Sequence, residues 1–135
     1  MKTITYKDGY KYQLMNDYVI QTDLKLHRDE DLDWLKLSSS GVLIIKKGYA
    51  WDGPSGPTID TRDFMRGSLV HDALYQLIRE DVLTEDDRKY ADKLLKDICL
   101  EDGMNPIRAW IVYQGVRLFG KGPATQPEKS PTTVP

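Results

Sequence analysis

The residues with the clearest chemical potential are His71-Asp72-Ala73-Leu74-Tyr75, which follow the glycine- and proline-rich run Trp51 to Pro57 after a short gap. On a helix, the imidazole, the carboxylate and the phenol would lie within about one turn. A tight loop of glycine and proline can direct several main-chain carbonyls at one point. Calcium prefers about six to eight such oxygen ligands. The pattern therefore indicates a site for a hard metal ion, with Asp72 as its charged ligand, and for an activated water molecule.

A histidine acts as a general base when a carboxylate holds its second ring nitrogen and fixes its tautomer. The sequence offers Asp92 for this role beside His71. Asp92 lies at the edge of an apolar stripe in the next predicted helix, and a short turn near residues 80–83 would fold that helix antiparallel to the first. Tyr75, one turn after His71, could bond to the same carboxylate. We therefore predict catalytic roles for His71, Asp92 and Tyr75.

Each of these residues also has a structural interpretation. His71 is compatible with a buried histidine that is satisfied by Asp92 or by a main-chain carbonyl. Asp72 could form an ion pair with a nearby arginine instead of binding metal. The arginines in reach are Arg62, Arg66 and Arg79. Asp92 could be a solvated partner of Arg88 or Lys93, and the glycine- and proline-rich run could simply shape a crossing from strand to helix.

Length and composition narrow the class of protein. The chain has 135 residues, 40% of them hydrophobic, which suits one domain with one core. Its net charge of −2 gives no broad cationic field, so nucleic acid is not expected as a partner. Cys99 is the only cysteine, so no intrachain disulfide can form. We expect no signal peptide and no transmembrane segment, because no apolar run has the required length.

Residues 1–50 have the composition of β-strands. Branched and aromatic residues gather in short runs, and Asp8-Gly9 favours a hairpin turn. The predicted strands are 3–6, 10–14, 18–22, 34–37 and 42–45. The run Val42-Leu43-Ile44-Ile45 is continuously apolar, which indicates a central strand. The charged stretch 27–33 indicates an exposed connection.

From residue 63 the apolar spacing becomes helical. Asp63 is predicted to cap a largely buried first helix, and Thr84 a second helix that Gly103 ends. Asn105-Pro106 is predicted to open a third helical segment over residues 107–119. Its predicted packing residues are Trp110, Ile111, Tyr113, Val116 and Leu118.

These elements predict an α+β fold, in which an N-terminal antiparallel β-sheet is followed by two or three packed α-helices. We expect a single domain over residues 1–120, with strands mainly in 1–50, a glycine- and proline-rich loop at 51–62 and helices in 63–120. Residues 121–135 are polar and rich in proline. That composition is typical of a flexible tail, or of an arm that orders only against a partner.

The glycine-rich loop, the helical His-Asp-x-x-Tyr motif and Ala91-Asp92 on the following helix together resemble the phospholipase A2 superfamily, particularly its disulfide-free viral capsid version. The resemblance covers about residues 49–95. It implies that His71 activates water, that Asp92 and Tyr75 support the histidine, and that Ca²⁺ is the cofactor. The calcium ligands it implies are Asp72 and the main-chain carbonyls of Trp51, Gly53 and Ser55.

A longer pattern resembles a family of small uncharacterised bacteriophage and prophage proteins. The pattern consists of Gly48-Tyr49-Ala50-Trp51-Asp52-Gly53-Pro54-Ser55-Gly56, Ser68 to Tyr75 and Gly115 to Gly120. This resemblance covers nearly the whole domain, and it implies an origin rather than an activity. The protein would then be found in the host cytoplasm or in the phage virion.

Two functions from different classes remain open. The first is a phage-encoded, calcium-dependent hydrolase of phospholipid esters. The second is a non-enzymatic virion protein of the tail or capsid, or an accessory protein, in which His71, Asp72 and Tyr75 form a structural network and the surface docks on other phage proteins. A metal-dependent phosphohydrolase is excluded, because its site needs several histidines and the chain has only His27 besides His71.

Overall fold

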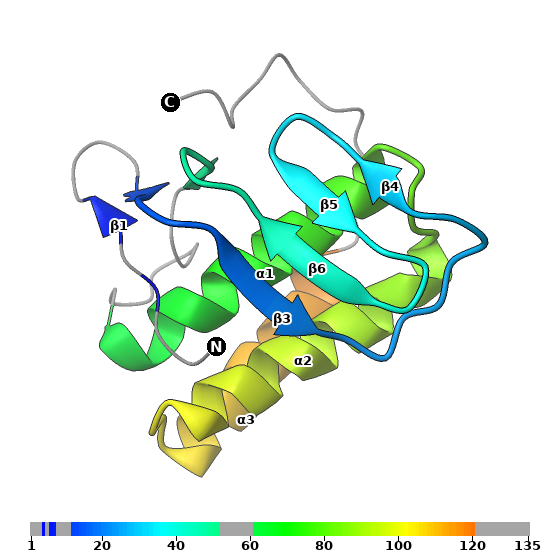
Figure 1. Cartoon of the computed structure of the whole chain (residues 1–135). Helices are drawn as coiled ribbons and strands as arrows, with labels where there is room; N and C mark the ends of the chain where they lie inside the picture. Colours follow the sequence, from blue (N-terminus) through cyan, green and yellow to red (C-terminus); the bar gives the residue numbers. More distant parts are fainter. Residues whose placement is uncertain (1–3, 5, 8–11, 52–60, 121–135) are drawn as a thin grey trace. The chain divides into compact units, whose positions relative to one another are not determined.

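The computed structural model describes residues 4, 6–7, 12–51 and 61–120 (Figure 1). It divides into two compact units, one holding the strands up to residue 52 and the other holding the helices from residue 53. The α+β class is as predicted, since antiparallel strands come first and three α-helices follow. The predicted tail at 121–135 lies outside the described residues, and the single domain stays a prediction.

The strands of the first unit form two antiparallel sheets. The strands are β1 (Tyr6–Lys7), β2 (Tyr12–Leu14), β3 (Tyr18–Gln21), β4 (Glu30–Asp31), β5 (Leu35–Leu37), β6 (Val42–Ile45) and β7 (Ala50–Trp51). The smaller sheet has the order β1-β2-β7 and the larger one the order β3-β6-β5-β4. β6 lies between β3 and β5, as expected for a continuously apolar strand.

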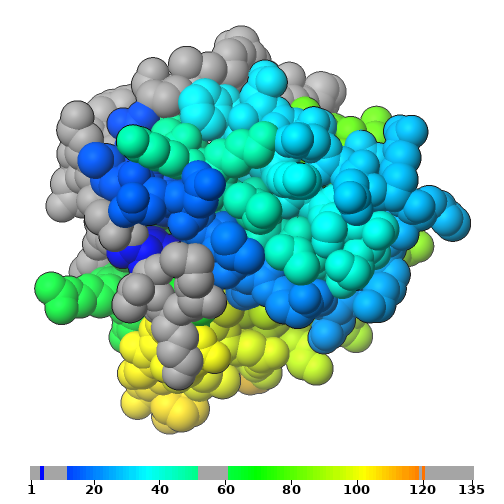
Figure 2. Space-filling model, in the orientation of Figure 1, coloured from blue at the N-terminus to red at the C-terminus, as the bar shows by residue number. Residues whose placement is uncertain are grey.

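The larger sheet buries one face. Leu35 pairs with Ile45 and Leu37 pairs with Leu43 across β5 and β6, and all four side chains are fully buried. Because side chains alternate along a strand, these four share one face. Figure 1 shows the four strands of this sheet side by side, and Figure 2 shows this part of the chain as one continuous region coloured from blue to green.

The first half departs from the sequence prediction in two details. The stretch 27–33 is not only a connection, because it contains β4, whose Asp31 accepts a hydrogen bond from Lys46 Nζ at 2.6 Å. Trp51, predicted as the start of the glycine- and proline-rich loop, lies in β7 instead, and residues 3, 5, 10 and 11 of the predicted strands lie outside the described residues. The turn predicted at Asp8-Gly9 lies outside the described residues.

The second unit contains α1 (Arg62–Arg79), the short 3-10 helix η1 (Glu85–Asp87), α2 (Arg88–Glu101) and α3 (Pro106–Phe119). The residue at the N-cap of α1 is Thr61, so the predicted cap at Asp63 is wrong. Asp63 lies in the first turn instead, where the helix dipole also favours a carboxylate. Thr84 and Asp87 form a capping box before α2, and Asn105 accepts hydrogen bonds from main-chain nitrogens at the start of α3.

The three helices share a core. The buried residues of this core are Phe64, Leu95, Cys99, Met104, Ala109 and Val112. α1 and α2 approach closely at Gly67, where a β-carbon would lie 2.9 Å from Leu95 Cδ1 and 3.0 Å from Cys99 Sγ. A side chain at that position would force the side chains of Leu95 and Cys99 to move.

α3 differs from its prediction in which side it buries. Trp110, Ile111 and Leu118 are exposed, with exposed fractions of 57%, 57% and 72%, although they were predicted to pack. Ala109 and Val112 are the buried residues instead. Apolar residues occur on every side of the helix, so their spacing does not reveal which side faces the core.

Candidate functional site

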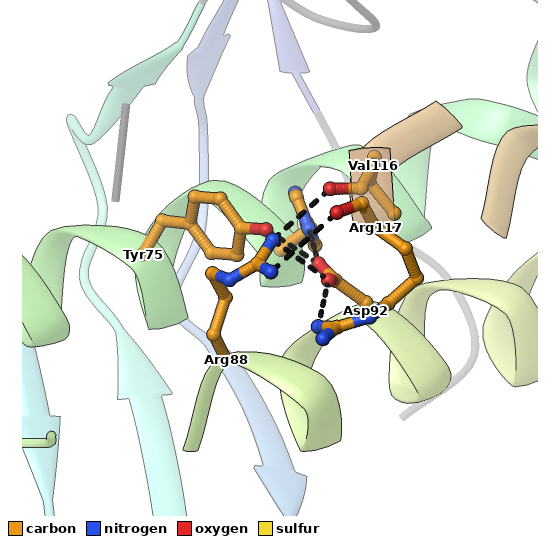
Figure 3. A network of polar contacts seen from close by, with 6 residues as sticks. Tyr75, Arg88, Asp92, Val116 and Arg117 are labelled. Carbon is orange, nitrogen blue, oxygen red and sulfur yellow. Dashed lines mark hydrogen bonds and ion pairs between the residues drawn. The ribbon is translucent and has the colours of Figure 1, made fainter. Parts of the chain in front are cut away.

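The candidate site is centred on Asp92, whose side chain is fully buried. His71 Nε2 lies 2.7 Å from Asp92 Oδ1, and the Tyr75 hydroxyl donates to the same oxygen at 2.6 Å. Arg117 Nη1 donates to Oδ2 at 2.8 Å, and Arg88 Nη1 lies 3.5 Å from Oδ2. Figure 3 shows Tyr75, Arg88 and Arg117 converging on this one carboxylate.

Helical spacing and one turn of the chain produce this arrangement. His71 and Tyr75 are one turn apart on α1, and their rings pack against each other at a centroid distance of 4.1 Å with a tilt of 40°. The chain reverses after α1 through Asp81, which adopts a left-handed φ of 62°, and the Leu83 main-chain N–H returns to the Leu77 carbonyl. α2 then runs back beside α1 and brings Asp92 opposite both rings. The predicted short turn is therefore present.

Arg117 was not predicted as part of the site, and Arg88 was considered only as an alternative, solvated partner of Asp92. Arg88 precedes Asp92 by four residues on α2, a spacing that brings two side chains together on one side of a helix. Its guanidinium also donates to the main-chain carbonyls of Val116 at 3.2 Å and Arg117 at 3.5 Å, near the end of α3. Arg117 comes from α3 itself, so no local spacing links it to Asp92. The side chain of Arg88 is buried, whereas that of Arg117 is 28% exposed.

The charge of Asp92 follows from its partners. Burial by itself raises the pKa of the carboxyl, but the hydrogen bonds from His71, Tyr75 and Arg117 lower it by more, so the pKa lies below its ordinary value. Burial and the bond to this carboxylate raise the pKa of the Tyr75 phenol. At neutral pH, Asp92 is therefore an anion and Tyr75 a neutral donor.

The tautomer of His71 follows from the charge of Asp92. An ionised carboxylate can only accept, so Nε2 of His71 must carry the proton in their hydrogen bond. A neutral imidazole then has its lone pair on Nδ1. Nδ1 has no hydrogen-bond partner within the described part of the chain, and the side chain is 12% exposed. The ring can thus accept a proton at Nδ1.

Of the predicted metal ligands, the structure describes Asp72 and Trp51, which belong to different units. Asp72 is half-buried on α1 next to His71, and Trp51 is buried in β7 of the other unit, where its ring packs on Tyr12 at 5.7 Å. Gly53 and Ser55 lie outside the described residues. Within residues 4, 6–7, 12–51 and 61–120, no group of three or more His, Cys, Asp or Glu side chains could hold a metal ion.

Two of the structural interpretations can be compared with these contacts. Asp92 is bonded to Arg88, but the interpretation of Asp92 as a solvated residue is wrong, because its side chain is fully buried. Arg66, one of the arginines considered for Asp72, pairs with Glu101 and Asp102 at the end of α2. A buried His71 that is satisfied by Asp92 remains compatible with the geometry.

Comparison with known proteins places the chain in a family. Residues 29–116 match the model of a family described as "Protein of unknown function (DUF1353)". No curated protein and no solved structure gave a match. Among the described residues, no helix is both long and apolar enough to cross a membrane. Because the match extends from β4 to within α3 and covers more than half of the sequence, the chain belongs to the DUF1353 family.

Proposed function

We propose that this protein is a phage-encoded, calcium-dependent hydrolase of phospholipid esters in which His71 is the general base. The observation that carries the proposal is the buried, ionised Asp92, which holds Nε2 of His71 at 2.7 Å and leaves Nδ1 as the proton acceptor. Tyr75 from α1 and Arg117 from α3 each hold one of the two oxygens of that carboxylate. The orientation of the ring is therefore set before any substrate binds.

The proposed reaction is the attack of water on the ester carbonyl. Nδ1 of His71 takes one proton from the water molecule as the oxygen bonds to the carbonyl carbon. Asp92 stabilises the imidazolium that forms, without taking the proton itself. The bond to the leaving alcohol then breaks, and Nδ1 returns the proton to the alcohol oxygen. The products are a carboxylic acid and an alcohol, and His71 is neutral again.

The donor set proposed for calcium consists of oxygen atoms, which suits that ion. Asp72 supplies a carboxylate one residue from His71, and the carbonyls of Trp51, Gly53 and Ser55 would complete the set from the main chain. When bound, calcium would stabilise the negative charge that develops on the carbonyl oxygen of the ester.

The choice of substrate and the phage origin rest on resemblance. The His-Asp-x-x-Tyr motif followed by Asp92 resembles the phospholipase A2 superfamily, in which these residue types serve the hydrolysis of lipid esters. The longer pattern of glycines and aromatic residues resembles bacteriophage and prophage proteins. We therefore place the protein in the host cytoplasm or in the virion, with phospholipid as its substrate.

One observation favours a second, non-enzymatic function. Arg88 and Arg117 neutralise Asp92, and Arg88 also bonds to two carbonyls of α3, so the network links all three helices. Such a network would stabilise a virion or accessory protein whose surface docks on other phage proteins. In that function, His71 is a packing residue and its Nδ1 takes no part in proton transfer.

Hydrolysis of fatty acid esters in phospholipid vesicles distinguishes the two functions. We expect the wild type to release fatty acid with calcium and not with a chelator. His71→Ala should lower the rate about 10²- to 10⁴-fold, as expected for the loss of a general base. Asp72→Asn should remove the dependence on calcium along with most of the activity.

His27→Ala is the matched control, because His27 is the only other histidine and is exposed. It should retain full activity. Circular dichroism of each variant shows whether the helices persist. A folded wild type without activity, or activity that is unchanged in His71→Ala, rules out the hydrolase and favours the structural function.

A further inference from the structure

α3 carries an unusual concentration of exposed apolar side chains. Ile107 and Leu118 are each 72% exposed, and Trp110 and Ile111 are each 57% exposed. Their spacing along the helix puts all four on one side, where Gln114 lies among them. The other large apolar residues that are exposed in the described part of the chain, Met15 and Leu100, are isolated and only about 40% exposed. We call the side of α3 formed by Ile107, Trp110, Ile111 and Leu118 the apolar face.

The apolar face is bordered by positive charge. α3 contains no acidic residue, and its two charged residues, Arg108 and Arg117, flank the face on opposite edges. Their side chains are 33% and 28% exposed, whereas the acids that they pair with come from other helices. Lys96 of α2 lies over the ring of Tyr113 at 5.2 Å and adds a third cation beside α3.

We propose that the apolar face docks on the surface of an anionic phospholipid membrane. Aliphatic residues and a tryptophan on one side of a helix, with arginine and lysine at the edges, match the interfacial region of a bilayer, where apolar groups enter the acyl boundary and cations meet headgroup phosphates. A second copy of the chain fits less well. It would bring its own Arg108 and Arg117 to the same rim, where α3 offers no acid.

The apolar face also adjoins the candidate site. Arg117 lies at its edge, and the same guanidinium donates to Asp92, which holds His71. Docking would therefore bring lipid headgroups to the helix that supports the general base. This inference rests on the proposed function, because it names a membrane surface as the form in which the substrate is presented.

Co-sedimentation with vesicles of ether-linked phospholipids tests docking without hydrolysis, since these lipids have no acyl ester. We expect the wild type to pellet with vesicles containing equal parts of phosphatidylglycerol and phosphatidylcholine, and to pellet less with phosphatidylcholine alone or in high salt. Ile111→Asp should weaken binding at least about tenfold, because it buries a charge at the centre of the contact. Leu100→Asp is the control on α2 and should bind as the wild type does.

A wild type that does not pellet with anionic vesicles, or an Ile111→Asp variant that pellets as well as the wild type, overturns the proposal. A dimer in sedimentation velocity that dissociates in Ile111→Asp, without vesicle binding, overturns it in favour of a second copy. A failure of the proposed hydrolase function gives a different result from a failure of membrane docking. In that case the protein still pellets with ether lipids but releases no fatty acid from ester lipids.

Discussion

At the scale of the residue, Asp92 is the group on which both proposed functions depend. It is buried, and it stays ionised because His71, Tyr75 and Arg117 contact its two oxygens. Because these contacts favour the ionised form of Asp92, its negative charge stabilises the folded protein. The pKa of Asp92 is lowered in the folded state, so this contribution is present at pH values above the ordinary value for aspartate and is lost as the pH falls through the folded value.

Asp92→Asn therefore has an effect whose size depends on pH. At neutral pH we expect it to lower the free energy of unfolding by about 3–5 kcal/mol, because Arg88 and Arg117 lose the carboxylate that neutralises them. The difference from wild type should shrink as the pH falls below about 4, because the unfolded chain is protonated there, and it should disappear once the pH falls below the lowered pKa of folded Asp92. Urea unfolding at a series of pH values measures this. Asp97→Asn, at an exposed position on α2, should change stability by no more than about 0.5 kcal/mol throughout. A difference that does not vary with pH would contradict the assignment of an ionised Asp92.

The contacts of Asp92 show how far sequence could predict the site. Its approach to His71 and Tyr75 follows from helical spacing and a short turn, which are local properties of the sequence. Arg117 lies 25 residues away in sequence and on a different helix, so its contact with Asp92 depends on how α3 packs. No periodic pattern in the sequence encodes that packing, because apolar residues occur on every side of α3.

At the scale of the element, the strongest predictions came from the ends of helices. Asn105-Pro106 predicted the start of α3, and Thr84 followed by acids predicted the start of the second helical segment, because unpaired main-chain groups at helix ends require such residues. Asp63 was mistaken for a cap because Thr61, two residues earlier, has the same chemical ability.

Substitutions of two glycines, Gly67 and Gly115, test how the helices pack. Gly67 lies where α1 and α2 approach, and a β-carbon there would meet Leu95 and Cys99. A β-carbon at Gly115 of α3 would meet nothing within 4 Å. We expect Gly67→Ala to lower the free energy of unfolding by about 1–3 kcal/mol, because buried neighbours must move. Gly115→Ala should raise it by about 0.5–1 kcal/mol, since alanine is the better helix former. Chemical denaturation of both variants compares them directly, and stabilisation by both would show that α1 and α2 can separate at little cost.

At the scale of the whole molecule, the strand unit and the helical unit can unfold either together or separately. Length and composition predicted a single domain, whereas the contacts divide the chain near residue 52. A unit of about fifty residues with short strands is expected to be marginally stable by itself. The prediction is therefore a single cooperative transition for the entire chain.

Each unit has its own probe for this transition. Cys99 is fully buried in the helical core, and burial raises the pKa of its thiol to about 12, so it should react only when the helices open. In a Trp110→Phe background, the remaining tryptophans are Trp34 and Trp51, which both lie in the strand unit. We expect tryptophan emission and pulse labelling of Cys99 to change at the same urea concentration. Loss of the tryptophan signal at lower urea, before Cys99 becomes reactive, would mean that the strands unfold first and that residues 1–120 are two domains rather than one.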